Sequence, residues 1–316
     1  MQRIRRDQAT IYALDGRLEP MLRVEAGEPF VIETDDASTG RLTSGKLLPT
    51  PDNTPYTAYA PAKANPVGGP VHVAGVTARS RIRIEIVDIK LEPHGVAYNQ
   101  PPISPLGTDS SFPEAGEYFL ERVEHGEAEA VISDRLRWPI WPMVGTLACA
   151  PEWEVHSSGS GQGPWGGNVD VLDFRPGATV ILSTYHEGGL LFAGDVHGCQ
   201  SDTEYFGTAD ESQATVTLRA WPEAGDLLPA PRAITDESIV ALGIARPLEA
   251  AAHAAIRHLL DWLVESYGFT RREAYLTAGL NPEFRLRVYQ MTSIDELAYV
   301  VGATLPRSFA ERVASS

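Results

Sequence analysis

The sequence predicts a mainly β protein, in which the strands of a sandwich or a barrel are followed by an α+β segment. Glycine and proline account for 28 and 24 of the 316 residues, and most of them precede residue 232. At that density they separate short strands and interrupt long helices. After about residue 247 the apolar residues take a helical spacing instead. We therefore expect a mainly β body over residues 1–232, which carries the site, with an α+β segment over residues 233–316 packed on it.

Two stretches, 81–86 and 214–219, alternate between apolar and polar residues. A period of two is typical of an antiparallel strand with one buried face. Three further stretches, 30–34, 179–185 and 190–193, are more continuously apolar and predict more fully buried strands. The first two thirds of the chain are thus expected to form mostly antiparallel sheets.

The C-terminal segment opens with a predicted helix over residues 248–267, where apolar residues recur every three or four positions. Pro247 suits its first turn and Gly268 suits its end. Residues 270–273 read Thr-Arg-Arg-Glu, a capping box that predicts a second, shorter helix. Residues 285–291 then predict one more strand.

Charge and composition exclude several classes of function. Asp and Glu outnumber Lys and Arg by 42 to 26, for a formal net charge of −16, and such a surface repels the phosphates of nucleic acids. No run of about 18 apolar residues occurs in the sequence, so no membrane span is expected. The two cysteines, Cys149 and Cys199, form no CxxC pair, and the N-terminal residues lack the apolar stretch of a signal peptide. We expect free thiols and a cytoplasmic location.

Residues 194–204 form the segment richest in potential chemistry. They follow an apolar stretch and read Gly-Asp-Val-His-Gly-Cys-Gln-Ser-Asp-Thr-Glu. A strand end is rigid and the loop beyond it can converge on a ligand, and closely spaced Asp, His and Glu side chains can hold a divalent ion. A polar turn with a surface histidine is the alternative, because the spacing matches no standard metal motif.

Two other segments, one rich in glycine and one rich in acidic residues, each admit a structural and a functional interpretation. Residues 159–170 are rich in glycine and match neither a P-loop nor a GxSxG motif; they predict either a flexible surface loop or a mobile cover closed by Trp165. Residues 33–40 place acidic side chains just after a predicted strand. They could bind a cation, although local hydrogen bonding explains most Asp-rich turns.

In this order the segments resemble the acetamidase/formamidase family of amide hydrolases, and the likeness covers most of positions 5–305. The resemblance rests on ETDD at 33–36, NPVGGPVHV at 65–73, GGNVD at 166–170, GDVH at 194–197, EYFGTA at 204–209 and SYGFT at 266–270. Two departures concern the pocket. Residues 200–204 read QSDTE where the family usually has QGDGE, and Val169 stands where the family usually has Met.

The resemblance implies a jelly-roll-like β-sandwich with a smaller barrel-like portion and an α+β C-terminal segment. It also implies hydrolysis of a short aliphatic amide, similar to formamide or acetamide, to a carboxylate and ammonia. An amide carbonyl is a poor electrophile, so its oxygen must be polarised, a nucleophile generated and the departing nitrogen protonated. A divalent ion can supply the first two, and a carboxylate can transfer the proton.

On this interpretation, the residues divide into three sets. The metal ligands would be Asp36, Asp195, His197 and Glu204. The catalytic residues would be Glu204, Asp202, Asn168 and Gln200, and the substrate would be contacted by Asn168, Asp170, Trp165 and Cys199. Mixed imidazole and carboxylate ligands favour zinc, whereas coordination dominated by oxygen would admit calcium.

Three alternatives stay open. The chain could hydrolyse a cyclic amide or an amidine-like substrate, or it could be a non-catalytic binding protein for small molecules that has lost activity through Ser201 and Thr203. Cys199, close to His197, is an alternative nucleophile. We also expect a homo-oligomer, a dimer or larger, because an assembly would cover the exposed edges of the predicted strands.

Overall fold

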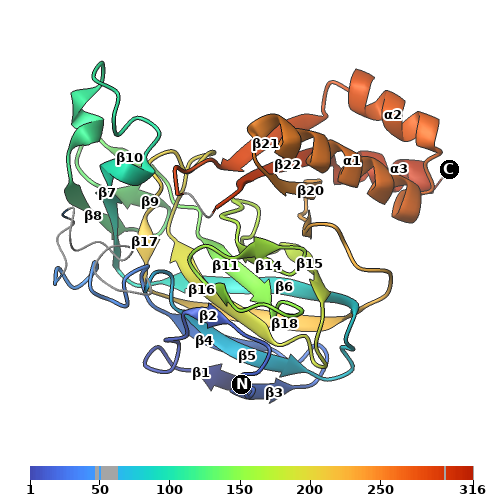
Figure 1. The fold of residues 1–316 in the computed structure, drawn as a ribbon, viewed down its shortest axis with the longest axis horizontal. Helices are drawn as coiled ribbons and strands as arrows, with labels where there is room; N and C mark the ends of the chain where they lie inside the picture. The colour runs from blue at the N-terminus through green and yellow to red at the C-terminus, as the bar shows by residue number, and fades with distance from the viewer. Residues whose placement is uncertain (47–49, 51–62, 295–296, 316) are drawn as a thin grey trace.

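The computed structural model describes residues 1–46, 50, 63–294 and 297–315. Two large sheets and three α-helices make up most of it (Figure 1). The mainly β prediction is confirmed: the described α-helices lie in the C-terminal segment, and two short 3-10 helices, Pro101–Ile103 and Pro113–Gly116, interrupt the β body. None of the described helices is long and apolar enough to span a membrane.

One sheet has nine strands and runs from the N-terminal to the C-terminal part of the chain. Its order is β1 (Gln2–Ile4), β4 (Phe30–Thr34), β18 (Ala214–Glu223), β6 (Ser80–Leu91), β15 (Thr179–Thr184), β19 (Arg232–Ile234), β20 (Ser238–Ala245), β22 (Tyr299–Pro306) and β21 (Arg285–Gln290). The two alternating stretches of the sequence are neighbours in it, since Ile84 pairs with Ala220 and Ile86 with Leu218. All three isoleucines of 81–86 are buried, as the period of two predicts.

The second sheet has eleven strands and carries the candidate site. Its main path is β10 (Arg137–Pro139), β9 (Glu129–Val131), β8 (Phe119–His125), β7 (His94–Asn99), β17 (Glu211–Ser212), β16 (Leu191–His197), β11 (Met143–Cys149), β14 (Gly166–Asn168) and β13 (Gln162–Gly163). Strand β5 (Val67–Val73) pairs with β16, and β3 (Leu22–Val24) pairs with β5. A short pair, β2 (Ala13–Leu14) with β12 (His156–Ser157), stands apart from both sheets.

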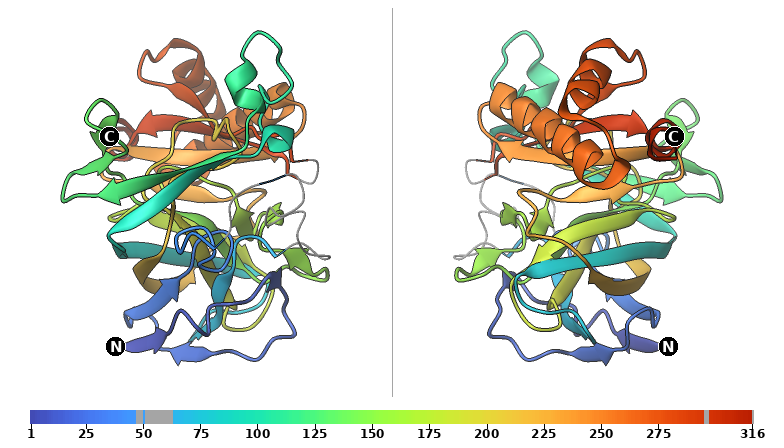
Figure 2. Two further views of the ribbon diagram at one scale, coloured as in Figure 1. Left: turned by 90° about the vertical axis from the view of Figure 1, so that its left-hand side faces the viewer. Right: turned by 90° about the vertical axis from the view of Figure 1, so that its right-hand side faces the viewer.

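The two sheets pack face to face around one large apolar core. Ile84 of β6 and Val216 of β18 meet Leu147 of β11 and Phe192 of β16 in the same buried cluster, which is the arrangement of a sandwich. Among the described strands, the nine-stranded sheet follows an open path from β1 to β21, and the eleven-stranded sheet runs openly from β10 to β13 with a branch at β16 through β5 to β3. The portion that was expected to be barrel-like is therefore an open sheet, of which β8, β9 and β10 form an extended arm (Figures 1 and 2).

The C-terminal segment places three helices beside the end of the nine-stranded sheet (Figures 1 and 2). Helix α1 (Leu248–Tyr267) ends at Gly268 in the left-handed conformation, and α2 (Arg271–Leu280) begins with the predicted capping box. Helix α3 is Arg307–Ala314. Helix α1 packs on β20 and β22, and their side chains form a second apolar cluster. Strand β19 pairs with both β15 and β20, so the sheet continues across residue 232 and the division there stays a prediction.

Candidate metal and active site

Two of the predicted ligands lie on β16. Asp195 and His197 are both buried and are two residues apart, a spacing that places side chains on one face of a strand. The His197 Nε2 lies 3.5 Å from the Asp195 Oδ1. Asn65, just before β5, donates from Nδ2 to the Asp195 Oδ2 at 2.6 Å. That hydrogen bond fixes the carboxylate beside the imidazole.

Asp170 brings a second carboxylate to the same place from the turn after β14. One ligand atom from each of Asp170, Asp195 and His197 lies within 4.8 Å of the others. Such a group of buried side chains could hold one divalent ion. Gly145 of β11 leaves the room for this approach, because a Cβ there would stand 2.4 Å from the Asp170 Oδ1 and 2.8 Å from the Asp195 carbonyl oxygen.

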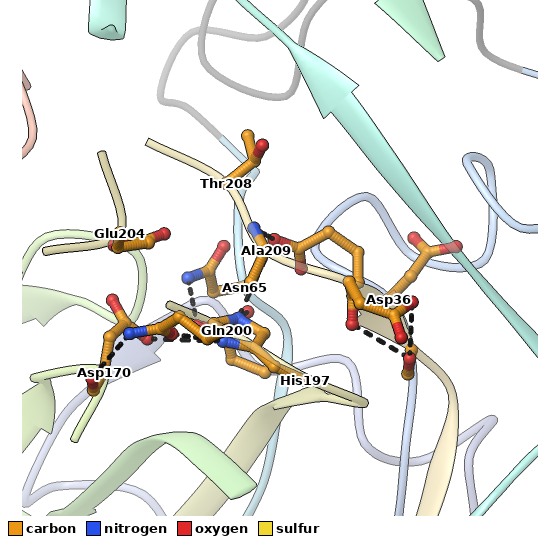
Figure 3. A network of polar contacts seen from close by, with 12 residues as sticks. Asp36, Asn65, Asp170, His197, Gln200, Glu204, Thr208 and Ala209 are labelled. Atoms are coloured by element: carbon orange, nitrogen blue, oxygen red, sulfur yellow. Dashed lines mark hydrogen bonds and ion pairs between the residues drawn. The ribbon is translucent and has the colours of Figure 1, made fainter. Parts of the chain in front are cut away.

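Two glutamates complete the cluster. Glu211 on β17 is the cross-strand partner of His197, and its Oε1 lies 3.7 Å from the His197 Nε2. Glu204 is buried in the loop between β16 and β17. Figure 3 shows Glu204, Asp170 and His197 gathered close together.

Two glutamine side chains orient this cluster. Gln200 accepts a hydrogen bond from the His197 Nδ1 at 2.8 Å and donates to the Asp170 carbonyl oxygen at 2.9 Å. With Nδ1 occupied in this way, a neutral His197 presents the lone pair of Nε2 to the carboxylates. Gln290, at the end of β21, donates from Nε2 to the Asp170 Oδ2 and to the Glu204 Oε2 at 3.3 Å. The C-terminal segment therefore contributes directly to the site.

The cluster holds an excess of buried negative charge. Burial raises the pKa of Asp170 to about 6 and that of Glu211 to about 8. Burial, together with the charge of Asp170, also raises the pKa of Glu204 well above its usual range. Burial lowers the pKa of His197, but the charges of Glu211 and Asp195 outweigh it and raise that pKa overall. Such a set of groups retains protons unless a cation neutralises it.

The donor set fits a metal ion. Three buried carboxylate oxygens, the Asp170 Oδ1, the Asp195 Oδ1 and the Glu211 Oε2, accept no hydrogen bond from the described residues. Unpaired carboxylate oxygens are costly to bury, and a divalent ion would satisfy them. The surrounding cavity, which we call the polar pocket, has a volume of about 10 Å³. Its described lining residues include Asn65, Asn168, Asp195, His197, Glu204, Glu211 and Gln290 together with Ala37, Tyr98, Gly207, Ile294 and Leu297.

Comparisons with known proteins give the same family as the sequence motifs. The model of the acetamidase/formamidase family matches residues 160–221, a stretch that contains Asp170, Asp195, His197, Glu204 and Glu211. The resemblance to that family is therefore confirmed.

Solved structures extend the likeness over the whole chain. An acetamidase from Bacillus halodurans is 27% identical with a TM-score of 0.85, covering 98% of this chain and 99% of its own. An acetamidase from Yersinia enterocolitica is 28% identical with a TM-score of 0.84, covering 98% and 92%. A predicted acetamidase/formamidase from Thermoanaerobacter tengcongensis shares the fold at 21% identity, with a TM-score of 0.86 and coverage of 100% and 98%. No curated protein sequence matches the chain.

The structure brings most of the predicted residues together. Asp195, His197 and Glu204, predicted as ligands, and Gln200, predicted as catalytic, lie in or against the cluster. Asn168 lines the polar pocket, and its Nδ2 donates to the Gly159 carbonyl oxygen at 2.8 Å. Asp170 has a different place from the one expected, because its carboxylate belongs to the possible metal group and not to a separate substrate-binding set.

Asp36 does not join the predicted ligands. Its Oδ1 accepts from the backbone N–H groups of Ser38 and Gly40, at 2.9 and 3.0 Å. Its Oδ2 accepts from the backbone N–H and the hydroxyl of Thr43, at 2.9 and 2.8 Å. Figure 3 shows Asp36 set apart from Asp170 and His197. Both oxygens are used to hold the turn, so assigning Asp36 to the metal was wrong and the Asp-rich turn explains this segment.

Asp202 and Cys199 also lie away from the cluster. Asp202 is half exposed and forms an ion pair with Arg287 at 2.8 Å, which contradicts a role in proton transfer inside the pocket. The Cys199 thiol accepts from the Trp138 Nε1 at 2.9 Å, and burial raises its pKa to about 12. A thiol that stays protonated is a poor nucleophile, and Cys199 lines a different pocket, described below.

Trp165 is a core residue and not a cover. It is 5% exposed and belongs to the large apolar core between the sheets. The glycine-rich segment around it forms β13 and β14, of which β14 pairs with β11. Gly166 and Gly167 have φ of 92° and 116°, and a Cβ at either would stand about 2 Å from a backbone oxygen, at 2.1 and 2.0 Å. The glycines therefore permit close packing of a hairpin, and the predicted mobile cover is wrong.

Sequence reasoning missed four residues of the site, which are Asn65, Gly145, Glu211 and Gln290. Asn65 opens the NPVGG motif, and Glu211 closes the acidic run after EYFGTA, so both lay beside motifs already noted. Gly145 and Gln290 had no such signal, because their roles depend on contacts across the sheet and between distant segments.

Proposed function

We propose that the protein is a metal-dependent hydrolase of a short linear amide, similar to formamide or acetamide, that releases a carboxylate and ammonia. The observation that carries this proposal is the buried group of Asp170, Asp195 and His197 inside the stretch that matches the family. The family and the two acetamidase structures support amide hydrolysis. The metal requirement and the linear substrate are the further steps proposed here.

Asp170, Asp195 and His197 would hold the ion, with Glu211 at its edge. A divalent ion there would polarise an amide carbonyl and make water a better nucleophile at neutral pH. Gln200 keeps the Nδ1 of His197 engaged, so that the lone pair of Nε2 faces the ion site. Mixed imidazole and carboxylate ligands favour zinc.

Two residues of the polar pocket suit the amide itself. The Asn168 side chain donates through Nδ2 to the Gly159 carbonyl oxygen, which leaves Oδ1 as a buried acceptor with no hydrogen bond from the described residues. That oxygen can accept an N–H of the substrate. Glu204, whose pKa is raised by burial and by the charge of Asp170, can carry a proton at neutral pH and deliver it to the departing nitrogen.

The test combines metal analysis with ammonia release by the purified protein. We expect bound divalent metal and ammonia from formamide or acetamide. His197→Ala should lose the metal and lower kcat/KM by more than about 100-fold. Substituting a residue that only hydrogen-bonds to a metal ligand costs at most about that much, and the loss of a ligand should cost more. His253→Ala is the matched control, because His253 is exposed on α1. His197→Ala with normal metal and activity would contradict the assignment.

A panel of substrates separates this proposal from its alternatives. A lactam opened to an amino acid while linear amides remain intact would favour a cyclic substrate. Bound metal without hydrolysis of any amide, lactam or amidine would favour a binding protein.

A further inference from the structure

A second and much larger pocket lies beside the polar one. Its volume is about 430 Å³, within the range of about 300–1,000 Å³ that is usual for small-molecule sites. We call it the aromatic pocket. The described residues that line it include Tyr98, Phe119, Trp138, Trp141, Phe206 and Gln200.

The two pockets share their walls. Tyr98 of β7 lines both. In the segment that leads into β17, Phe206, Thr208, Ala209 and Asp210 line the aromatic pocket, whereas Gly207 and Glu211 line the polar one. Residues 206–211 therefore border both pockets and form a common wall.

Gln200 connects the two pockets as well. It lines the aromatic pocket, while its Oε1 accepts from the Nδ1 of His197. A group bound in the aromatic pocket would thus lie next to the side chains that hold His197 and Glu211.

The lining of the aromatic pocket selects against an anionic ligand. Its described lining residues include two carboxylates, Glu121 and Asp210, and no Lys, Arg or His. Asp210 is buried and its charge is matched by His125, whose Nε2 lies 2.9 Å from the Asp210 Oδ2. Glu121 is exposed. What remains for a ligand is apolar surface.

The aromatic side chains are open to a ligand. Phe119 is 40% exposed, Trp138 is 37% exposed and Phe206 is 48% exposed. Aromatic rings prefer offset or edge-to-face contact with other rings, so a phenyl group or an alkyl chain would complete the packing of this pocket.

We propose that the aromatic pocket binds the apolar acyl group of the substrate, so that amides with a phenyl or longer alkyl group are hydrolysed in preference to acetamide. This inference rests on the proposed function, since it places the amide group of the same molecule in the polar pocket. Water forms the new C–O bond, the C–N bond breaks, and the nitrogen leaves with a proton as ammonia. The apolar group takes no part in the chemistry and contributes binding.

Ammonia release from acetamide, hexanamide and 3-phenylpropanamide tests the inference. We expect kcat/KM for 3-phenylpropanamide to exceed that for acetamide by at least about tenfold, the lower end of what an apolar pocket distinguishes. Phe206→Ala should reduce this ratio by at least about fivefold, because a truncated ring loses most of its contact with the ligand. Phe112→Ala should leave it unchanged. Phe112 and Phe206 are equally exposed, at 48%, and Phe112 is absent from the described lining of the pocket.

A binding measurement separates failure of this inference from failure of the proposed function. The ketone 4-phenylbutan-2-one has the shape of 3-phenylpropanamide and cannot be hydrolysed, so its binding is measured by ligand-observed NMR. Binding to the wild type that weakens in Phe206→Ala, without hydrolysis of any amide, would support the pocket and overturn the proposed function.

Two results would overturn the inference itself. The first is acetamide hydrolysis with no preference for larger amides and no effect of Phe206→Ala on ketone binding. The second is a dimer in solution that Phe206→Ala dissociates while the ketone fails to bind, which would assign the aromatic side chains to a second copy of the chain.

Discussion

The two neighbouring pockets are built in opposite ways. The polar pocket has a volume of about 10 Å³ and the aromatic pocket about 430 Å³. Buried side chains from β14, β16, β17 and β21 define the polar pocket, and hydrogen bonds fix them. Half-exposed rings on β8, on β10 and in the loop before β17 line much of the aromatic pocket. Catalytic groups must be held in fixed positions. Side chains that contact an apolar part of a substrate can be substituted singly, with an effect on substrate preference alone.

A chain of amides fixes the polar pocket from the side of the C-terminal segment. Gln162 donates from Nε2 to the Asn168 carbonyl oxygen at 2.8 Å and to the Gln290 Oε1 at 2.6 Å. Gln290 then donates to Asp170 and Glu204. Each amide is oriented by the next, so the positions of the carboxylates depend on contacts between segments that are far apart in sequence.

The largest expected effect on stability lies outside both pockets. Trp165→Ala removes a buried indole from the core, and we expect a loss of about 3–5 kcal/mol in the free energy of unfolding. Because Trp165 is absent from the described lining of both pockets, kcat/KM of the folded variant should change by less than about twofold. Urea unfolding and acetamide kinetics below the transition measure the two quantities.

Trp153→Ala is the control for that experiment, because Trp153 is 87% exposed. Its free energy of unfolding should change by less than about 0.5 kcal/mol. A Trp165→Ala variant that is as stable as the wild type but loses tenfold in kcat/KM would instead support the hypothesis that this segment is a mobile cover of the site.

Gln290→Ala tests whether hydrogen bonds fix the polar pocket. We expect kcat to fall by about 10–100-fold, the range for residues that orient metal ligands. The hydrogen bond from Gln290 lowers the pKa of Asp170 against the dominant effect of burial. Its removal raises that pKa further, so the acid limb of the pH–rate profile should move to higher pH.

Gln213→Ala is the matched control, since Gln213 also donates an amide hydrogen bond to an aspartate, Asp35, outside the described lining of the polar pocket. We expect its pH–rate profile to match the wild type. An unchanged acid limb in Gln290→Ala, or an equal shift in both variants, would argue against positioning by Gln290.

Much of the fold follows from short-range patterns. Helix α1 has the bounds that its periodicity, Pro247 and Gly268 predict, and α2 begins at the predicted capping box. The strands at 81–86 and 214–219 are present and longer than predicted, as β6 and β18. In each case a local signal, such as a hydrophobic period or a helix cap, and the tertiary packing favour the same secondary structure.

The site follows from sequence in part. Asp195 and His197 were predicted because Asp, His and Glu side chains follow an apolar stretch at short spacing. Both lie on β16 itself and not in the loop beyond it. Asp36 and Asp202 were misassigned because a carboxylate in a loop can bind a metal, hold a turn or form an ion pair, and the sequence does not choose among these. Gln290 was missed because its role arises from the contact of β21 with the loop that carries Glu204, 86 residues earlier in the chain.

The smallest expected effect concerns the wall that both pockets share. Asp210 lines the aromatic pocket and precedes Glu211, and His125 holds it. The His125 Nδ1 faces the Glu92 carbonyl oxygen at 2.7 Å and its Nε2 faces the Asp210 carboxylate at 2.9 Å. Both ring nitrogens thus have acceptors, which favours the doubly protonated ring. Burial lowers the pKa of His125, but the hydrogen bond to Asp210 outweighs it and raises that pKa overall.

The pairing of His125 with Asp210 makes the free energy of unfolding depend on pH. A histidine whose pKa is raised on folding stabilises the protein fully below its unfolded pKa of about 6.5, and the effect is lost as pH rises through the folded pKa. His125→Gln should therefore lower the free energy of unfolding by about 2 kcal/mol at pH 5.5, the typical value for a hydrogen bond between charged groups, and by less at pH 9. Urea unfolding at both pH values measures the difference, with the exposed His253→Gln as control. Because His125 supports a wall common to both pockets, acetamide and 3-phenylpropanamide should lose activity in the same proportion. A loss for one substrate alone would show that the two pockets do not depend on the same wall.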